Sequence, residues 1–382
     1  MAKVQKTISS KSLLILGSRG IPAAHSGFET FAEKLALYLN KKKWKVTVYN
    51  QEKGSFKRYI SYWRGIKRIH FQVPLNGPLS TIIFDLFVAI DALSKKGLLM
   101  TLGYNSALFN ILNFAKGQIN LINMDGIEWK RGKWNSIVKF WFWLNELFAQ
   151  FFGTWLIADH PEIERHVKRF GINKNVVMLP YGAERNPAIN AKFLDENSLT
   201  EYGYGLVIAR MEQENSIFEI VKTFSNKKRD FMLIVLGKLE PDKNSYHKKI
   251  IDCASSEVKF LGAIFEQENV NALRKYSKFY IHGHTVGGTN PSLIEAMSCN
   301  CQIIAHDNIY NKWVLGNKGR FFSSEKDLEE QINVYISDIS CKMNNNSAKE
   351  RFLKNFTWDK ILLDYEKFLE KFINNENKNN IN

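Results

Sequence analysis

The chain of 382 residues is poor in cysteine, and the spacing of the few cysteines excludes the simplest disulfide and metal schemes. Its four cysteines are Cys253, Cys299, Cys301 and Cys341. They form no CxxC pair and have no histidine partner at the spacing of a zinc site. This pattern indicates neither a disulfide framework nor a metal centre, and it is typical of a protein from a reducing cytoplasm.

Long apolar runs are also missing. The N-terminal region offers only LLIL at residues 13–16, which is too short for the core of a signal peptide. No stretch reaches the roughly 18 consecutive apolar residues of a membrane-spanning helix. We therefore expect a cytoplasmic protein without a transmembrane segment.

Acidic residues are scarce in the first part of the chain. Residues 1–70 hold 15 Lys or Arg, three Glu and no Asp, so +12 of the total net charge of +15 lies there. This excess predicts an anionic partner such as membrane lipid or a phosphate-bearing substrate, although it could serve solubility alone. Nucleic acid is a third anionic partner, and a basic nucleic-acid-binding protein is the less favoured alternative function. Because the basic residues accompany no recognisable nucleic-acid motif and no aromatic platform, we predict no nucleic-acid partner.

Apolar strand patterns alternate with helical patterns along most of the chain, which predicts an α/β fold with mostly parallel sheets. Strands are expected at residues 12–17, 45–49, 69–73, 98–102, 119–124, 155–158, 176–179, 205–210, 231–236, 258–261, 279–281 and 302–305. The pattern lapses into polar residues within 181–198. We expect two doubly wound Rossmann-like domains, 1–183 and 184–355, then a C-terminal helix at 356–373 that packs back across the domains, and a disordered tail at 374–382.

One segment, NSIVKFWFWLNELFAQFFGTW at residues 135–155, is unusually aromatic. Its polar positions fall on one narrow helical stripe made of Lys139, Glu146, Gln150 and Gly153. The pattern favours a helix buried in the domain. The alternative is a helix that also touches the membrane interface, since tryptophan is favoured at that depth and Lys130, Arg131 and Lys133 precede the segment.

The stretch Ile281–Met297, IHGHTVGGTNPSLIEAM, combines a strand end, a glycine loop and a helix start. Asn290 is a favoured N-cap and Pro291 suits the first helical position. We expect free amides at Ser292 and Leu293 to attract an anion. The expected ligand contacts are His284, Gly287, Gly288, Thr289, Asn290, Ser292, Leu293 and Glu295. The alternative is a glycine-rich turn of any α/β protein.

Four stretches together give the sequence a resemblance to a known family. They are SRGIPAAHSGFETFAEKLA, NMDGIEWKRGKW, LIADHPEI with LPYGAE, and HGHTVGGTNPSLIEAM, which run from residue 18 to residue 297. In these motifs the chain resembles the bacterial rhamnosyltransferases of capsule and exopolysaccharide assembly, within glycosyltransferase family 4.

The resemblance implies a GT-B fold, in which two Rossmann-like domains face a cleft. It implies that the C-terminal domain binds a nucleotide-sugar donor, dTDP-L-rhamnose, and that the N-terminal domain binds a lipid-linked saccharide acceptor. It also implies a retaining transfer by an enzyme at the inner face of the cell membrane. A sugar-nucleotide epimerase of the same fold is the alternative enzyme.

Individual residues match the family pattern and depart from it. Glu295 matches the second of two glutamates eight residues apart, which holds the ribose, whereas Gly287 stands at the place of the first. Arg210 matches the arginine that steadies the diphosphate, but Asn215 replaces the lysine usually found five residues later. These departures reduce the positive charge expected at the leaving group and suggest a different contact to the donor sugar.

The chemistry of glycosyl transfer makes the same demands on the residues. A diphosphate leaving group needs cations or amides, and Arg210 and the helix start at Pro291 can supply both without a metal ion. We therefore expect no metal and no cofactor.

Candidates on the acceptor side come from the N-terminal domain. Asp125 follows an apolar strand, where a carboxylate could orient or deprotonate an acceptor hydroxyl, or it could be a turn residue before Gly126. Gly27, Glu29 and His25 belong to the first glycine loop and the helix start that follows it. This loop is not GxGxxG, so the dinucleotide fingerprint is absent.

Overall fold

The computed structural model describes residues 7–24, 26–317, 319–337 and 346–373. The chain divides into two compact units. The N-terminal unit contains residues 1–130, 134–180 and 359–382, and the C-terminal unit contains residues 131–133 and 181–358. The main division at Pro180–Tyr181 lies close to the expected boundary at residue 183. The expected disordered tail, 374–382, lies outside the described residues.

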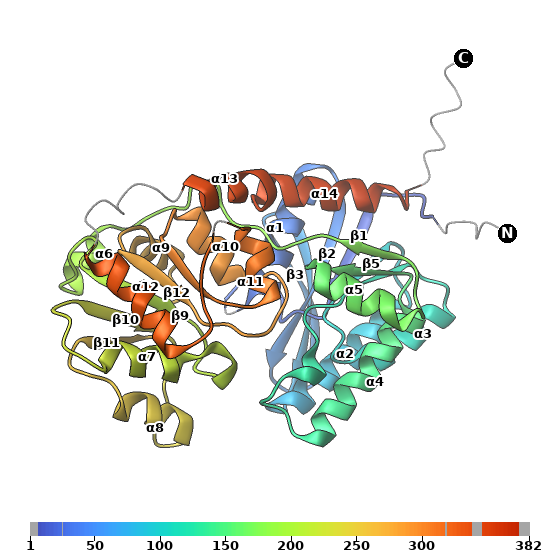
Figure 1. Cartoon of the computed structure of the whole chain (residues 1–382). Helices are drawn as coiled ribbons and strands as arrows, with labels where there is room; N and C mark the ends of the chain where they lie inside the picture. The colour runs from blue at the N-terminus through green and yellow to red at the C-terminus, as the bar shows by residue number, and fades with distance from the viewer. Residues whose placement is uncertain (1–6, 25, 318, 338–345, 374–382) are drawn as a thin grey trace, which may run out of the picture. The chain divides into compact units, whose positions relative to one another are not determined.

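The N-terminal unit is built on an eight-stranded sheet (Figure 1). Its strands are β1 (Ser12–Leu16), β2 (Lys45–Lys53), β3 (Arg58–Trp63), β4 (Ile66–Val73), β5 (Leu98–Leu102), β6 (Asn120–Asn123), β7 (Trp155–Ala158) and β8 (Val176–Met178). Their spatial order is β3-β4-β2-β1-β5-β6-β7-β8, and only β3 runs antiparallel to its neighbour. The carboxyl ends of all the other strands therefore lie at one edge of the sheet, where ligands of such folds bind.

The helices of this unit are α1 (Gly27–Lys41), α2 (Pro78–Ala92), the 3-10 helix η1 (Ala107–Phe109), α3 (Asn110–Ala115), the 3-10 helix η2 (Glu128–Lys130), α4 (Ser136–Phe152), α5 (Pro161–Phe170) and α14 (Trp358–Glu370). The start of α1 is capped by Ser26, whose side chain accepts a hydrogen bond from the amide of Glu29. Such a cap satisfies one of the donors left free at a helix start. The apolar face of α1, with Phe31, Leu35 and Leu39, is buried.

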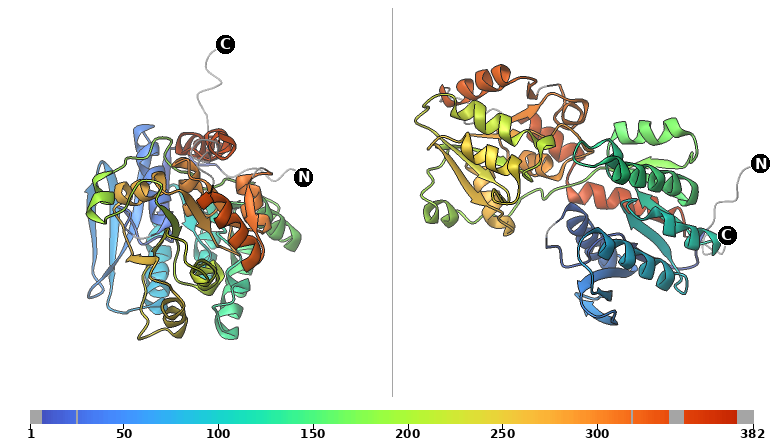
Figure 2. Two further views of the ribbon diagram at one scale, coloured as in Figure 1. Left: turned by 60° about the vertical axis from the view of Figure 1, so that its left-hand side comes forward. Right: turned by 90° about the horizontal axis from the view of Figure 1, so that it is seen from below.

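The last helix, α14, returns to the N-terminal unit and packs beside α1 (Figures 1 and 2). The hydroxyl of Tyr38 donates to a carboxylate oxygen of Glu366 at 2.6 Å, and the rings of Phe31 and Tyr365 lie 4.8 Å apart. These contacts tie the end of the chain to its first βαβ segment.

Helix α4 buries its polar stripe and exposes much of its aromatic face, whereas the favoured prediction was a helix buried in the domain. Its polar residues Asn145, Glu146 and Gln150 are buried, whereas Phe140 and Phe151 are 60% and 58% exposed. The buried side chains make hydrogen bonds inside the unit. The carboxylate of Glu146 accepts from Trp129 Nε1 at 2.6 Å and contacts His166 Nε2 at 2.7 Å, and Asn145 Oδ1 accepts from the amide of Leu108 at 3.0 Å. Because polar groups can be buried only when they are paired, these partners draw the polar stripe inward and leave the aromatic face outside.

The C-terminal unit contains a six-stranded, wholly parallel sheet of order β11-β10-β9-β12-β13-β14. Its strands are β9 (Tyr204–Ile208), β10 (Met232–Leu236), β11 (Val258–Gly262), β12 (Phe279–His282), β13 (Ile303–His306) and β14 (Arg320–Phe322). Its helices are α6 (Lys192–Glu196), η3 (Gln213–Asn215), α7 (Ile217–Ser225), α8 (Ser245–Asp252), α9 (Gln267–Lys275), α10 (Pro291–Ser298), α11 (Ile309–Leu315), α12 (Glu325–Ser337) and α13 (Asn346–Asn355).

Two hydrophobic cores cover the two faces of this sheet. Successive strand residues point to opposite faces, and accordingly Tyr280 belongs to one core while Phe279 and Ile281 belong to the other. The first core includes residues of α9, α10 and α13, and the second includes residues of α7 and α12. The sheet is therefore doubly wound, as predicted for both domains. Within the described residues, no helix combines the length and the apolar content needed to cross a membrane.

Candidate functional site

The candidate donor site lies at the carboxyl edge of the C-terminal sheet, between β9 and β12. These strands are neighbours and run parallel. The chain leaves β9 toward β10 on one side, whereas β12 continues to β13 on the other. Such a reversal of strand order opens a crevice beyond the strand ends. The loop after β9 carries Arg210, and the loop after β12 carries the glycines and the start of α10.

The start of α10 is capped differently from the prediction. The side chain of Asn290 accepts a hydrogen bond from the amide of Ser292 at 3.0 Å, and its carbonyl accepts from the amide of Leu293 at 3.2 Å. The expectation that these two amides are free is therefore wrong, because the N-cap already pairs them. The amides of Gly287 and Gly288 make no hydrogen bond within the described part of the chain, so they are the donors that remain for a ligand.

Gly287 has a backbone conformation that ordinary residues rarely adopt, with φ at +130°. A Cβ atom added there would meet nothing within 4 Å. The glycine is therefore required by the backbone and not by packing. The space beside Gly287 is open, so a ligand can approach the loop closely here.

Glu295 is held by a buried arginine that the sequence did not identify. Its Oε2 atom lies 2.6 Å from Nη2 of Arg274, whose side chain is only 2% exposed, while the Glu295 carboxylate remains 24% exposed. Arg274 also contacts Ser292 Oγ at 3.3 Å, and the hydroxyl of Tyr280 lies 2.7 Å from the same oxygen. This network fixes one side of the Glu295 carboxylate and leaves the other side for a ligand hydroxyl.

Two predicted contact residues of α10 therefore have structural roles. The side chain of Ser292 belongs to the network around Arg274, and the side chain of Leu293 is fully buried in the core. These side chains are not placed to bind a ligand. Thr289 is buried as well, while Asn290 acts through its cap.

His282, the last residue of β12, and His284 in the following loop are stacked, with ring centroids 4.2 Å apart. Burial, reinforced by the positive charge of Arg210, lowers the pKa of His284 to about 3. Burial likewise lowers the pKa of His282 well below its ordinary value. Both rings are therefore neutral near pH 7. The Nδ1 atom of His284 is buried without a hydrogen-bond partner in the described structure, so it is available to a bound ligand.

The guanidinium of Arg210 is exposed to solvent, two residues after the carboxyl end of β9. The residue is exposed, and its side chain makes no hydrogen bond with any described residue. Its carbonyl accepts a hydrogen bond from Asn215 Nδ2 at 2.8 Å. Asn215, which stands where the resemblance expects a lysine, therefore positions the backbone of Arg210 instead of adding a second charge.

The N-terminal candidates lie at the carboxyl edge of the other sheet. Asp125 follows β6 and has a left-handed backbone with φ at +49°, a conformation that aspartate adopts more readily than most residues other than glycine. Asn123 Oδ1 accepts from its amide at 2.9 Å, and Tyr104 holds the next residues by accepting from the Glu128 amide and donating to the Gly126 carbonyl. These hydrogen bonds hold the turn that carries the carboxylate of Asp125.

Glu29 is not placed to contact a substrate. The residue is 3% exposed, and its carboxylate accepts a hydrogen bond from the amide of Ala24 at 3.0 Å. The residue braces the loop before α1, because a buried carboxylate needs such donors. Gly27 is the first residue of α1, and His25 lies outside the described residues.

The fold is GT-B, and comparison with known proteins agrees with it. The computed structure is similar to sucrose-phosphate synthase from Thermosynechococcus elongatus, with a TM-score of 0.76 at 14% identity over 94% of this chain and 98% of the other. It is also similar to HepE of Anabaena in complex with UDP and glucose, with a TM-score of 0.74 at 15% identity over 94% and 99% of the two chains.

Sequence comparison finds similarity to glycosyltransferases over parts of the chain. Residues 191–351 match the family described as glycosyl transferases group 1, and residues 10–184 match a domain of unknown function, DUF1972. A protein of Methanocaldococcus jannaschii, named an uncharacterized glycosyltransferase, is 25% identical over 177 residues. That match covers 44% of this chain and 45% of the relative, so it spans less than half of either protein.

Proposed function

We propose that the protein transfers a sugar from a nucleotide donor to a lipid-linked saccharide in capsule or exopolysaccharide synthesis, with retention of anomeric configuration. The proposed donor is dTDP-L-rhamnose. The observation that carries the proposal is that Arg210 follows β9, while Gly287, Gly288 and Glu295 follow β12, the two strands at the switch point of the C-terminal sheet.

Each of these groups has a role that fits the chemistry. The exposed guanidinium of Arg210 and the two glycine amides stabilise the diphosphate as the bond to the sugar breaks. Glu295, held on one side by Arg274, accepts hydrogen bonds from the ribose hydroxyls. The neutral ring of His284 offers Nδ1 to a hydroxyl of the donor sugar. Asp125 of the N-terminal unit orients the acceptor hydroxyl.

The proposal is tested by incubating the purified protein with a panel of nucleotide sugars and a bacterial lipid extract. Release of free nucleoside diphosphate from dTDP-L-rhamnose, dependent on the extract, is the expected result. Diphosphate release from a UDP-sugar alone would keep the transferase and overturn the rhamnose assignment. An epimerase would instead give a soluble sugar product without any lipid acceptor.

Removal of divalent metal is expected to leave turnover within about twofold of the untreated enzyme. The physical reason is that Arg210 and the amides of Gly287 and Gly288 already supply positive charge and donors to the diphosphate. The measurement is the initial rate in EDTA against the rate in added magnesium or manganese. A complete loss of turnover in EDTA, restored by either metal, would contradict the proposed leaving-group site.

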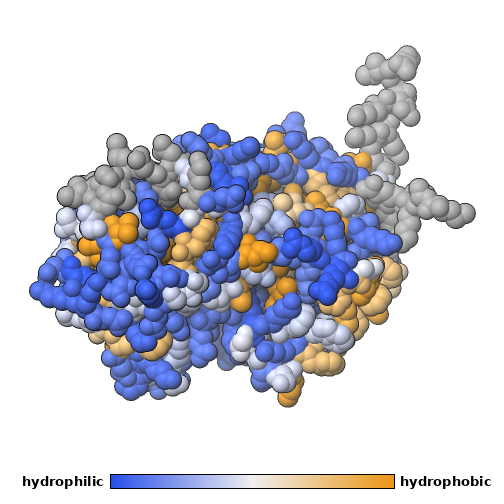
Figure 3. All heavy atoms as spheres, viewed as in Figure 1, coloured by the Kyte–Doolittle hydropathy of each residue, from blue (hydrophilic) through white to orange (hydrophobic). Residues whose placement is uncertain are grey.

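We also propose that the protein works as a peripheral enzyme on the anionic inner face of the cell membrane. The aromatic face of α4 supports this, because Ile137 is 81% exposed and Phe140 and Trp143 are exposed beside it. Ile111 and Phe114 of α3 are exposed as well, and Figure 3 shows hydrophobic side chains gathered over the region of α3 and α4. Exposed apolar patches of this kind mark interaction sites.

Charge and residue type indicate lipid as the partner of this face. Lys130 and Lys139 flank the start of α4, and Lys116 follows α3. A basic surface attracts anionic lipid with about 1 kcal/mol per residue near the membrane, while Trp and Phe are favoured at the depth of the headgroups. The N-terminal excess of +12 acts in the same direction.

The Phe140→Ser, Trp143→Ser double variant is expected to lose most of its binding to phosphatidylglycerol vesicles. The wild-type protein should sediment with these vesicles, less so as salt screens the charges, and less so when Lys41, Lys42 and Lys43 become Gln. The control is Phe265→Ser, which removes an exposed aromatic residue from the C-terminal unit. A wild-type chain that stays in the supernatant at low salt would rule the membrane proposal out.

A further inference from the structure

A pocket opens at the carboxyl edge of the N-terminal sheet, between β1 and β5, and none of the residues discussed above occupies it. Its enclosed volume is small, about 40 Å³, so it can take a hydroxyl-bearing edge of a ligand but not a whole sugar ring. The residues that line it are Leu16, Gly17, Thr81, Asp85, Val88, Ala89, Thr101, Leu102, Gly103, Asn105, Ser106, Ala107, Phe109 and Asn110. They come from the ends of β1 and β5, from α2 and from the η1–α3 segment.

The position of the pocket is the switch point of this sheet. From β1 the chain goes through α1 to β2 on one side, while β5 begins the other half of the strand order. Open α/β sheets bind their ligands beyond the carboxyl ends of such strands. The pocket therefore lies where the fold places a ligand, on the unit proposed to bind the acceptor.

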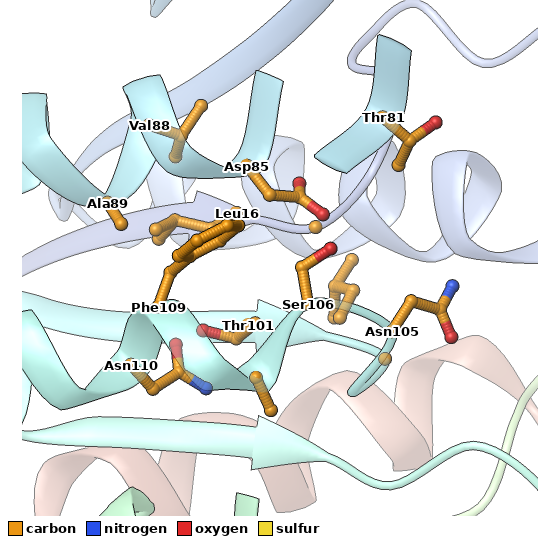
Figure 4. A pocket seen from close by; sticks show the side chains of 14 residues that line it. Leu16, Thr81, Asp85, Val88, Ala89, Thr101, Asn105, Ser106, Phe109 and Asn110 are labelled. Atoms are coloured by element: carbon orange, nitrogen blue, oxygen red, sulfur yellow. The ribbon is translucent and has the colours of Figure 1, made fainter. Parts of the chain in front are cut away.

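Some polar groups of the pocket lack a hydrogen-bond partner within the described structure. Asp85 of α2 and Ser106 point toward each other across the opening (Figure 4). Asn110 is 6% exposed, and its Nδ2 atom has no hydrogen-bond partner in the described structure. A buried amide donor without a partner is costly and uncommon in folded proteins, so a ligand atom that accepts a hydrogen bond would satisfy it.

The combination of groups selects one kind of ligand. An ammonium group would pair with Asp85 but cannot accept from Asn110, and a phosphate would accept from Asn110 but would be repelled by Asp85 when that side chain is ionised. A polyol offers one hydroxyl that donates to the carboxylate and a second that accepts from the amide. The apolar neighbours Leu16, Val88 and Phe109 suit the carbon atoms that bear such hydroxyls.

We propose that this pocket is a subsite for a hydroxyl-bearing edge of the acceptor saccharide, with Asp85 and Asn110 as its specificity-determining contacts. The inference rests on the proposed function and deepens it, because it states which part of the N-terminal unit reads the acceptor.

The protonation of Asp85 predicts that saccharide binding at the subsite depends on pH. Burial raises the pKa of Asp85 to about 7, and the hydroxyl of Ser106 offsets this only in part. Asp85 is the only titratable residue among those that line the pocket. A carboxylate accepts a stronger hydrogen bond from a hydroxyl than the neutral acid does. Saccharide binding should therefore strengthen as pH rises from 6 to 8.

The test is the binding of octyl glycosides of glucose, galactose and N-acetylglucosamine to the full chain, measured by saturation-transfer NMR without any donor. We expect at least one glycoside to bind the wild-type protein more tightly at pH 8 than at pH 6. Asp85→Asn should weaken it tenfold or more at pH 8 and abolish the pH dependence, and Asn110→Asp should weaken it as well. The control is Asp91→Asn on the same helix, since Asp91 is bound to Arg58 and Tyr49 and does not line the pocket.

The outcomes separate this inference from the proposed function. Equal affinity of the wild-type protein and Asp85→Asn for every glycoside, or no binding of any glycoside, would overturn the subsite. The two results can also differ. If Asp85→Asn binds the glycosides more weakly but the wild-type protein transfers no sugar from any nucleotide donor, the subsite is supported and the proposed function is contradicted. In a protein that does transfer sugar, the same variant should raise KM for the acceptor and leave KM for the donor unchanged.

Discussion

Replacing Arg210 with alanine is expected to lower sugar transfer by about 100- to 1,000-fold while the protein keeps its fold. Loss of one preorganised group that stabilises developing charge typically has an effect of this size on kcat. The fold should survive because the Arg210 side chain is exposed and makes no hydrogen bond with any described residue. Its backbone contact with Asn215 is independent of the side chain.

The measurement is kcat with saturating donor, together with the melting temperature of each variant. Arg210→Lys should recover part of the activity, because the charge is kept while the planar fork is lost. Arg320→Ala is the matched control, since Arg320 is an exposed arginine of the same unit that lies over Tyr335, outside the candidate donor site. A folded Arg210→Ala protein with near wild-type turnover would remove this residue from the diphosphate site.

Glu295 is expected to respond differently to glutamine and to alanine. Glu295→Ala should abolish measurable transfer and also destabilise the protein by about 3 kcal/mol, because it leaves the buried guanidinium of Arg274 without its counter-charge. Glu295→Gln keeps a hydrogen-bond acceptor for Arg274, so it should retain most of the stability. It should still lower transfer about tenfold or more, since a neutral amide accepts weaker hydrogen bonds from a ribose.

The comparison of the two variants separates ligand binding from folding. Activity and the free energy of unfolding are measured for both, with Glu268→Ala as a control on an exposed carboxylate of α9. If Glu295→Gln transfers sugar at the wild-type rate while Glu295→Ala is merely unstable, Glu295 is a partner of Arg274 and not a donor contact.

The doubly wound sheets could be predicted because apolar runs of buried parallel strands stand out between helical periods. The edge strand β3 was missed, since its residues are mostly exposed and carry no apolar run. It pairs with β4 through a two-residue turn at Arg64 and Gly65, both with positive φ. The pair Arg-Gly is a weak form of the usual hairpin signal. Strand β14, which has only three residues, was missed for its shortness.

Helix α4 shows that helical periodicity alone does not predict which face of a helix is buried. A helix with one polar stripe and one broad apolar face is ordinarily buried by its apolar face. Here the partners of the stripe, such as Trp129 and His166, are distant in the sequence, so nothing local indicates that Glu146 will be buried.

The strand, loop and helix start of the candidate donor site could be predicted from the sequence, but the contacts that support them could not. A strand, glycines and a proline-started helix are local signals, and they placed the loop after β12 correctly. The pairing of Arg274 with Glu295 joins α9 to α10 across the core and leaves no trace in sequence spacing. The pairing of the Ser292 and Leu293 amides, by contrast, follows from the predicted N-cap at Asn290, because an N-cap accepts from the first free amides of its helix.

The central claim is that a nucleotide-activated sugar is transferred to a lipid-linked saccharide through Arg210 and Glu295. The most direct measurement is the mass of the lipid-linked product after incubation of the full chain with dTDP-L-rhamnose and bacterial lipid extract. The account predicts a new lipid species heavier by one deoxyhexose, present with the wild-type protein and absent with Arg210→Ala. No change in lipid mass with any nucleotide sugar, from a folded protein, would contradict it.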